Sequence, residues 1–412
     1  MKTMKKLIYL FLALLIVACS SEDGGNDGDN NGDNNDNQST DTTAPIITIL
    51  GESDVSIVQY TSYTDAGATA TDNVDGNLTS SIVTSGSVNI NSIGSYTITY
   101  NVSDEAGNTA TASRQVIVTA AENPVFLAEN GITIKAREWA VVGATGEIDF
   151  VTYTVVDEEM LRYMVAFPNE YDITKVATTR VTDMSGMFYY EFSEYNQPIG
   201  NWDVSNVTNM SEMFRGNLVF NQPIGDWDVS NVTNMFYMFH AAEGFNQPIG
   251  DWDVSNVTDM RYIFGNAYSF NQPIGNWDVS NVTSMYYVFH KCYVFNQPIG
   301  NWDVSNVTDM TNMFEGARSF NRPIGNWDVS NVTSMSGMFS IPNQNAQSDF
   351  NQDISNWDVS NVNEMMIMFR RATSFNKNLS SWDVSNVTNC DSFSEFAINW
   401  TEPKPNFTIC NP

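Results

Sequence analysis

The residues of this chain that are best suited to chemistry recur in the same pattern. A Trp-Asp pair opens the motif WDVSNV, whose copies begin at Trp202, Trp227, Trp252, Trp277, Trp302, Trp327, Trp357 and Trp382. Surface tryptophans could stack on sugar rings, and a row of carboxylates could bind calcium. A Trp present in every copy is explained better as core, with its indole N–H bonded to a neighbour. The aspartates are then predicted to accept backbone N–H groups of the Val-Ser-Asn turns that follow them.

Catalytic arrangements are not visible in the sequence. The two histidines, His240 and His290, hold the same position in different repeats, after the Phe of a Met-x-x-Met-Phe element, and are predicted to lie on a helix surface. There is no Ser-His-Asp or Cys-His set, no zinc spacing and no phosphate loop. Acidic pairs that could hydrolyse glycosides are frequent, but the repeat multiplies them, which suits structure better. We therefore expect no enzyme, no catalytic residue and no cofactor.

The motif recurs every 25 residues, except for a spacing of 30 between Trp327 and Trp357. A fixed period of this size predicts a solenoid, because one unit cannot bury its own apolar face. Met210, Met213 and Phe214 follow a strong N-cap type, so a short helix is predicted to start there. A short parallel strand is predicted around Pro223–Trp227, starting after the Pro, which lacks an N–H. The insertion at 341–349 should bulge from one coil.

Two variable positions lie between the Met residues of each repeat, and the helical wheel turns them outward. The candidate partner-binding residues there, with a further variable position past the helix, are Phe236, Tyr237, Tyr262, Tyr268, Tyr286, Tyr287 and Tyr293. A contiguous aromatic patch usually marks an interaction site, and Tyr is favoured in binding hot spots. The alternative is that these tyrosines fill gaps between adjacent helices.

Charge and cysteine usage limit the partners and the compartment. The chain holds 48 acidic and 18 basic residues, for a net charge of −30, which disfavours nucleic acid and anionic lipid headgroups as partners. Cys390 and Cys410 flank the last half-turn and are predicted to form a disulfide in an oxidising exterior. Cys292 occupies a small-residue position and is predicted to be a buried free thiol.

The N-terminus resembles a bacterial lipoprotein signal peptide. Lysines precede an apolar run from Leu7 to Ala18, which ends in the lipobox-like sequence Leu-Ile-Val-Ala-Cys at Cys19. The resemblance implies that residues 1–18 are removed and that the Cys19 thiol is acylated; an ordinary secretory signal is the alternative. The run is too short to span a bilayer, which takes about 20 residues. The pair Glu22–Asp23 is similar to export signals of outer-membrane lipoproteins, which implies an outer-membrane protein exposed at the cell surface.

The sequence predicts a disordered segment over residues 19–43 and a folded domain over residues 44–120. The first segment is rich in Gly, Asn, Asp and Ser, which predicts a disordered acidic tether. In the second, apolar residues alternate from Tyr96 to Val102 and turn motifs separate short segments, which predicts a small all-β sandwich. The segments TAPIITILG and GSYTITYNVSDEAGNTATASRQVIV resemble a bacterial immunoglobulin-like domain of surface proteins.

Three aspartates of this β region, Asp72, Asp75 and Asp104, could bind calcium at one end of the sandwich. The favoured alternative is that they are turn residues that bond their own backbone.

Residues 121–181 are predicted to cap the solenoid, because its first coil would otherwise expose an apolar cross-section. Strands are expected at Ile132–Ala136 and Val151–Val156, and a helix is expected to open at 157–159. The solenoid itself is assigned to 182–395, and residues 396–412 to a C-terminal cap or tail.

The repeats closely resemble the 25–26-residue units of BspA-type leucine-rich-repeat-like bacterial surface proteins, over about residues 180–395. The resemblance implies an adhesion or protein-interaction solenoid. The predicted fold is therefore multidomain: a small immunoglobulin-like sandwich followed by an α/β solenoid of short parallel strands and short helices. The expected function is a lipid-anchored surface protein that presents its solenoid to a host, matrix or microbial protein or glycan, and that contacts the membrane through the lipid alone. The alternatives are a structural surface spacer and a glycan-capture lipoprotein for nutrient uptake.

Overall fold

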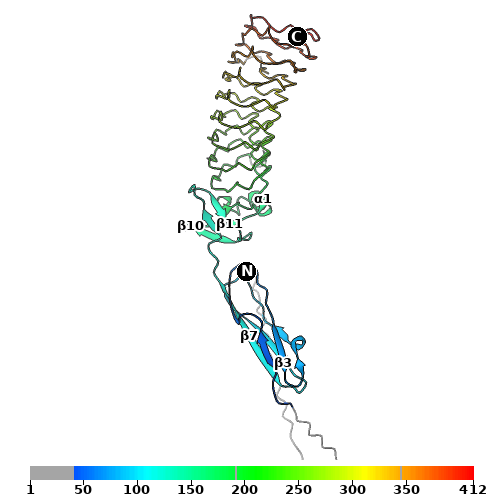
Figure 1. Ribbon diagram of the computed structural model, residues 1–412. Coiled ribbons are helices and arrows are strands. Elements are labelled where there is room, and N and C mark those ends of the chain that lie inside the picture. The colour runs from blue at the N-terminus through cyan, green and yellow to red at the C-terminus, as the bar shows by residue number, and fades with distance from the viewer. Residues whose placement is uncertain (1–40, 191–192, 344–345) are drawn as a thin grey trace, which may run out of the picture. The chain divides into compact units, whose positions relative to one another are not determined.

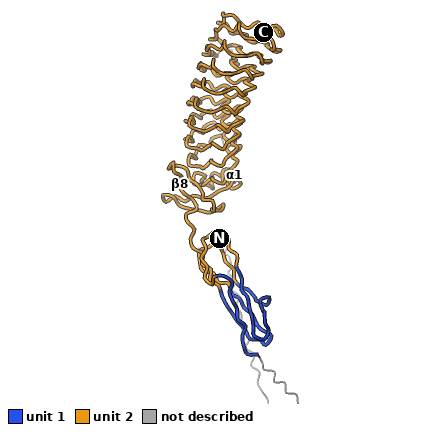
Figure 2. Tube along the Cα trace, in the orientation of Figure 1, with its two compact units in different colours: residues 1–51, 66–85, 99–113 blue, residues 52–65, 86–98, 114–412 orange. Residues whose placement is uncertain are grey.

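The computed structural model describes residues 41–190, 193–343 and 346–412 (Figure 1). Cys19, the predicted signal peptide and most of the predicted tether lie outside the described residues. The chain divides into two compact units (Figure 2). The first takes its described residues from 1–51, 66–85 and 99–113, and the second takes them from 52–65, 86–98 and 114–412. Within the described ranges, no helix has the length and apolar character needed to cross a membrane.

The predicted β region holds two separate sheets. Its elements are β1 (Ile46–Ile49), β2 (Asp54–Val58), β3 (Ala68–Asp72), β4 (Gly76–Asn77), η1 (Thr79–Ser81), β5 (Val83–Ser85), β6 (Gly94–Ser103) and β7 (Thr109–Thr119). One sheet has the strand order β1-β3-β4, and the other has the order β2-β7-β6-β5, with β2 parallel to β7. On β6 the predicted alternation buries Ile98, Tyr100 and Val102, which is the period of a strand with one face in a core.

The region from 121 to 181 combines short strands with the one α-helix among the described residues. Its elements are β8 (Val125–Leu127), β9 (Ile134–Ala136), β10 (Thr145–Ile148), β11 (Val151–Val155), α1 (Glu158–Ala166), η2 (Ile173–Lys175) and β12 (Val176–Ala177). Helix α1 begins where predicted, because the Asp157 side chain accepts the N–H of Met160 at 2.9 Å. Arg162 of α1 donates to the carbonyl of Ser185 at 2.9 Å, and the Ile134 N–H donates to Asn201. These bonds fasten the cap to the first coils.

The repeats form a stack of coils (Figure 1), and their apolar residues align in columns along the stack. Successive Phe rings of the Met-x-x-Met-Phe element lie parallel, as at Phe214 and Phe239, whose centroids are 5.5 Å apart. The Phe of each FNQPIG motif makes a second column, with Phe245 and Phe270 at 6.1 Å. All these rings are at most 2% exposed. Each coil therefore buries its apolar residues against its neighbours, as a solenoid requires.

The predicted helix after the first Met of each repeat is absent. The second residue between the Met residues has a left-handed backbone, which interrupts a right-handed helix. The positive φ angles at this position belong to Gly186, Glu212, Tyr237, Tyr262, Tyr287, Asn312, Gly337, Ile367 and Ser392. Most coils have a further left-handed residue four positions later, such as Gly216 at φ 73°. The coil is therefore a run of tight turns.

The hydrogen bonds of this run alternate between two directions. The N–H of Met213 donates back to Met210 at 3.3 Å, which closes a turn. The N–H of Glu212 instead donates to Phe236 of the next coil at 2.7 Å. A helix would bond each N–H four residues back within its own segment. The Asn209 side chain accordingly accepts the N–H two residues on, as an Asx turn does, rather than capping a helix.

The predicted strand around Pro223–Trp227 is also absent. The coils bridge in parallel at the residue before the first Met instead, as in the pairs Asn209–Asn234 and Asn234–Asp259. In the FNQPIG segment the coils are linked through side chains. The N–H of Asn246, for example, donates to the Asn221 carboxamide at 2.9 Å. Since Pro supplies no N–H, a backbone ladder is unfavourable here. The repeat is thus a stack of turns, and the prediction of an α/β solenoid was wrong.

The insertion and the last coil are both tied into the stack. The N–H of Ile341, which is buried, donates to Arg370 at 2.9 Å, and the N–H of Asp349 donates to Arg318 at 2.8 Å. At the C-terminal end, Trp400 packs edge-on against Phe375, with 4.8 Å between the ring centroids. Aromatic contacts therefore close the end of the Phe columns.

Candidate functional site

The aromatic candidates form two stacks on neighbouring coils. In the first stack, Tyr262 lies between Tyr237 and Tyr287, with centroid distances of 4.2 and 4.5 Å. Their left-handed backbone position places the three rings in register, because each coil repeats the same turn. In the second stack, Tyr268 and Tyr293 lie 4.7 Å apart. The predicted alignment of Tyr237, Tyr262 and Tyr287 is therefore present.

The helical-wheel expectation that these side chains point fully outward was wrong. All seven candidates are half-buried, because the rings cover one another. Phe236 meets the Tyr237 ring edge-on at 4.3 Å, and Tyr286 meets Tyr262 in the same way at 5.3 Å. Part of each ring is accessible, so the stacks are neither core nor isolated surface residues.

Arginines that the sequence did not single out contact both stacks. The Arg215 guanidinium lies 4.3 Å from the centroid of Tyr237, and Arg318 lies 4.4 Å from that of Tyr293. Arg261 lies over Phe236 at 5.0 Å. Such cation–π contacts are stabilising at about 0.5–1 kcal/mol each where solvent is near. The stacks therefore combine aromatic rings with positive charge in a strongly acidic chain.

Burial favours the neutral forms of two groups beside the first stack, Tyr287 and His240. It raises the pKa of Tyr287 to about 12, so the hydroxyl remains a hydrogen-bond donor. It lowers the pKa of His240 to about 4, with Arg215 adding to the effect. His240 is half-buried and His290 is 9% exposed, so the prediction that both are surface helix residues was wrong. The His290 ring lies 3.1 Å from the Glu315 carboxylate.

The repeated Trp residues lie in the core, where they cannot serve as a sugar platform. Trp252 is 3% exposed, and its indole N–H donates to the carbonyl of Ile224 in the preceding coil at 3.1 Å. The corresponding bond recurs in each of the eight copies. The predicted indole bond to a neighbour is present in the structure.

The repeated aspartates bond their own turns. Asp253 accepts the hydroxyl of Ser255 at 2.6 Å and its N–H at 3.0 Å. The hydroxyl and then the N–H lower the pKa of this carboxyl, which holds it ionised. Asp303 makes the same two bonds with Ser305. These contacts match the turn interpretation, rather than a calcium ladder.

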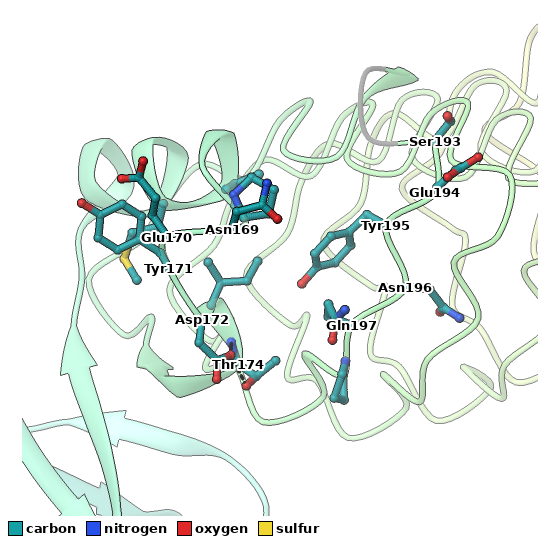
Figure 3. Close-up of a pocket in the computed structure, with 15 residues that line it drawn as sticks. Asn169, Glu170, Tyr171, Asp172, Thr174, Ser193, Glu194, Tyr195, Asn196 and Gln197 are labelled. Atoms are coloured by element: carbon teal, nitrogen blue, oxygen red, sulfur yellow. Dashed lines mark hydrogen bonds between the residues drawn. The ribbon is translucent and has the colours of Figure 1, made fainter.

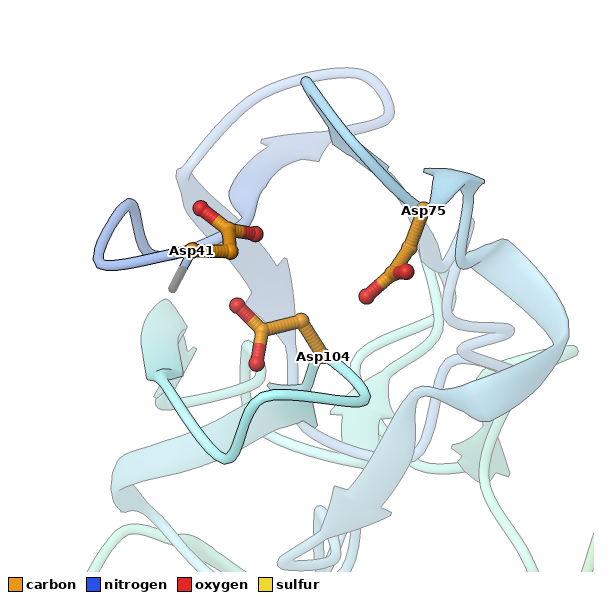
Figure 4. Close-up of side chains that lie close together, drawn as sticks. All are labelled: Asp41, Asp75 and Asp104. Carbon is orange, nitrogen blue, oxygen red and sulfur yellow. The ribbon is translucent and has the colours of Figure 1, made fainter. Parts of the chain in front are cut away.

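The β region brings three carboxylates together, but not the three considered as calcium ligands from the sequence (Figure 4). One oxygen each of Asp41, Asp75 and Asp104 lies within 4.8 Å of the others. Oxygens of this kind bind divalent cations such as calcium. Asp72 stands outside the set, and its carboxylate accepts the N–H groups of Val74 and Asp75. Asp41 was missed because it was assigned to the tether.

The same acidic set is also engaged with its own backbone. Asp104 accepts the N–H of Asn108 at 2.7 Å, and Asp75 accepts that of Glu105 at 2.8 Å. The turn interpretation of these aspartates therefore describes part of what they do.

A larger cavity lies in the second unit, between the cap and the first coil (Figure 3). Its volume is about 820 Å³. Helix α1, the segment around η2 and the first FNQPIG-type segment supply its walls. The polar lining includes Glu170, Asp172, Tyr195 and Gln197. The sequence interpretation did not single out this place.

A smaller cavity of about 260 Å³ borders the insertion. Lys291, Tyr293 and Arg318 line it together with Ile341 and neighbouring residues. It therefore joins the second tyrosine stack to two cationic side chains.

The structure has the predicted bonding state for three of the four cysteines. Cys390 and Cys410 are joined in a disulfide, with 5.8 Å between their Cα atoms. Cys292 is a buried free thiol whose Sγ donates to the carbonyl of Phe264, and burial raises its pKa. The proposed acylation site Cys19 lies outside the described residues.

Two protein families match different regions of the chain. Residues 47–118 match the Ig-like domain of bacterial surface proteins, so the chain carries a bacterial surface domain there. None of the curated proteins matches the chain. Among solved structures, the lipoprotein BT2262 from Bacteroides thetaiotaomicron is 25% identical, with a TM-score of 0.18; the match covers 19% of this chain and 40% of that one.

The repeats and the cap helix match a second family. The family described as "Mycoplasma protein of unknown function, DUF285" matches residues 158–272, 247–348 and 344–409, which together are more than half of the chain. The likeness to BspA-type repeats stays a resemblance. The chain is a bacterial surface protein with an Ig-like domain, and it belongs to the DUF285 family.

Proposed function

We propose that this chain is a lipid-anchored adhesion protein of the outer membrane, whose coils bind a host, matrix or microbial protein or glycan through the two tyrosine stacks. The observation that carries the proposal is the alignment of Tyr237, Tyr262 and Tyr287 on consecutive coils, with their rings half-buried and stacked. No catalytic residue is part of the proposal.

The position of the stacks supports a recognition role. Most residues of each repeat are the same in every coil. They therefore offer a partner the same surface all along the stack and cannot direct it to one position. The stacks occur where the sequence varies. Arg215 and Arg318 contact their rings, and Arg261 lies over the neighbouring Phe236. Tyr and Arg are enriched among the residues that dominate binding energy at interfaces. Rings already fixed by stacking lose little conformational freedom on binding, which favours affinity.

Anchoring through Cys19 is the second part of the proposal. The lipobox-like sequence and the bacterial surface Ig-like domain support it. Replacing Cys19→Ser should remove fatty-acid labelling and release the chain from the membrane fraction. If fatty-acid labelling and membrane attachment are unchanged in this variant, Cys19 is not the site of lipid anchoring. Protease treatment of intact cells tests the outer-membrane surface position, because only an exposed chain is cleaved.

The experiment for the binding face replaces three rings at once. The variant Tyr237→Ser, Tyr262→Ser and Tyr287→Ser removes the first stack, and a Phe triple variant keeps the stacking while removing the hydroxyls. A matched control changes the exposed residues Asp226, Asp251 and Asn276 of the same coils to Ser.

Cells displaying each variant are then tested for adhesion to epithelial layers, extracellular matrix and other bacteria, and each purified chain is melted. We expect the Ser triple variant to lose adhesion while the control keeps it. Full adhesion by the Ser triple variant, with only a lower melting temperature, would instead support the gap-filling interpretation. A chain that adheres to nothing would support a structural spacer.

A further inference from the structure

One residue in the first coil differs from its counterparts by a single polar atom. Tyr195 occupies the first position of the FNQPIG-type motif, which is Phe in the other copies: Phe220, Phe245, Phe270, Phe295, Phe320, Phe350 and Phe375. Its ring does the packing that the Phe rings do, because it stacks on Phe188 at 4.3 Å with an interplanar angle of 11°. The hydroxyl is the added group.

That hydroxyl is buried and forms no hydrogen bond with any described residue. A buried polar group left in this state is destabilising. Phe would fill the same space without that cost, as it does in seven other coils. The hydroxyl therefore has no structural role that a Phe ring would not fulfil.

Tyr195 lines the cavity of about 820 Å³ beneath the cap, with its hydroxyl oxygen covered by the wall. In Figure 3 the Tyr195 side chain lies above that of Gln197 and points toward the segment that carries Tyr171, Asp172 and Thr174. Pockets for small ligands typically measure about 300–1,000 Å³. The cavity is therefore of the right size for a mono- or disaccharide.

The charges of the lining limit the ligand. Glu170, Asp172 and Glu194 contribute carboxylates, and none of the described lining residues is Lys or Arg. Lys175, outside the lining, pairs with Asp172 at 3.0 Å, so the carboxylates of Glu170 and Glu194 leave a net negative charge. The hydroxyl of Thr174 donates to Asp172 and holds the pKa of its carboxyl below the usual range. An anionic ligand such as a phosphate or a uronic acid would be repelled. Carboxylates and carboxamides are, however, well suited to accept hydrogen bonds from sugar hydroxyls, and the Tyr171 ring offers an apolar surface.

We propose that this cavity binds a neutral sugar, with the Tyr195 hydroxyl as one of its hydrogen-bonding groups. The site is separate from the tyrosine stacks, so it does not depend on the proposed adhesion face. It would give the cap a binding function of its own.

The test uses the full chain and saturation-transfer NMR with glucose, galactose, mannose and N-acetylglucosamine, and with their β-linked disaccharides. Arginine amide and lysine amide serve as cationic probes. Calorimetry then measures the affinity of each bound sugar for wild type, for Tyr195→Phe and for the control Tyr153→Phe, a half-buried Tyr of the cap that does not line the cavity.

We expect at least one neutral sugar to bind, with about tenfold weaker affinity in Tyr195→Phe, since one hydrogen bond to a buried group is lost. The melting temperature of Tyr195→Phe should stay equal or rise, because the variant restores the residue of the other coils. Tyr153→Phe should bind the sugar as wild type does. Equal sugar affinity in Tyr195→Phe, binding of the cationic probes alone, or no binding of any sugar would overturn the proposal.

Discussion

Removing one core tryptophan should destabilise the coil stack without any involvement of a ligand. In Trp252→Ala the side chain lost is 3% exposed and is stacked against Trp227 at 6.4 Å. A buried aromatic side chain covers about 150–250 Å². At about 25 cal/mol per Å² this corresponds to about 4–6 kcal/mol of burial. The carbonyl of Ile224 also loses the indole N–H that it accepts at 3.1 Å.

Large-to-small substitutions of this kind cost about 3–5 kcal/mol, so we expect the upper part of that range. Urea unfolding followed by circular dichroism measures the loss. Because each coil contacts only its neighbours, a central defect should also broaden the transition. The control Asp251→Ala changes an exposed residue beside Trp252 and should stay within about 0.5 kcal/mol of wild type. A loss below about 1 kcal/mol in Trp252→Ala, together with lost partner binding, would refute the core assignment and favour a stacking platform.

Three further predictions concern backbone strain, pH and the disulfide. Ile367 has a φ of 50°, where a β-branched residue is strained, so Ile367→Asn should raise the unfolding free energy by about 1 kcal/mol in urea titrations; a loss of that size would contradict the strain argument. The pKa values of Asp253, Asp303 and Asp358 are lowered by the serines they bond, so their stabilisation is present above the unfolded value of about 4 and is lost as the pH falls below it. Melting curves across this range should show a smaller acid-induced drop for the combined variant Ser255→Ala, Ser305→Ala and Ser360→Ala than for wild type, and an identical drop would count against it. Cys410→Ser opens a loop with a sequence separation of 20 and should cost about 3 kcal/mol near the last coil, measured by hydrogen exchange; free thiols in a non-reduced digest of wild type would refute the bond.

The core of the repeat could be predicted from the sequence, but the path of its backbone could not. A large apolar residue in each copy has to be buried somewhere, so the Trp and Phe columns follow from the period. Spacing at Met210, Met213 and Phe214 fits a helix, but it fits consecutive tight turns equally well. Gly or Asn occupies some of the left-handed positions, as at Gly216, Asn312 and Gly337, and indicates turns there. Tyr and other side chains occupy most of the remaining copies, so the turns could not be predicted from residue type alone.

The candidate sites could also be predicted only in part from the sequence. The register of Tyr237, Tyr262 and Tyr287 follows from the period alone, and the structure adds their stacking. The contribution of Arg215 could not be predicted, because it depends on how the side chain folds over a ring in the next coil. The cavity beside Tyr195 required the packing of the cap against the first coil, although the exchange of Phe for Tyr was visible in the sequence.

The most direct test of the adhesion proposal is an array of immobilised proteins and glycans, including neutral and acidic sugars, probed with the full chain. Wild type, the Ser triple variant of Tyr237, Tyr262 and Tyr287, and the control triple variant of Asp226, Asp251 and Asn276 are compared on the same array. We expect at least one partner that wild type and the control bind and that the Ser triple variant does not bind. Equal binding by all three chains, or no bound partner at all, would contradict it.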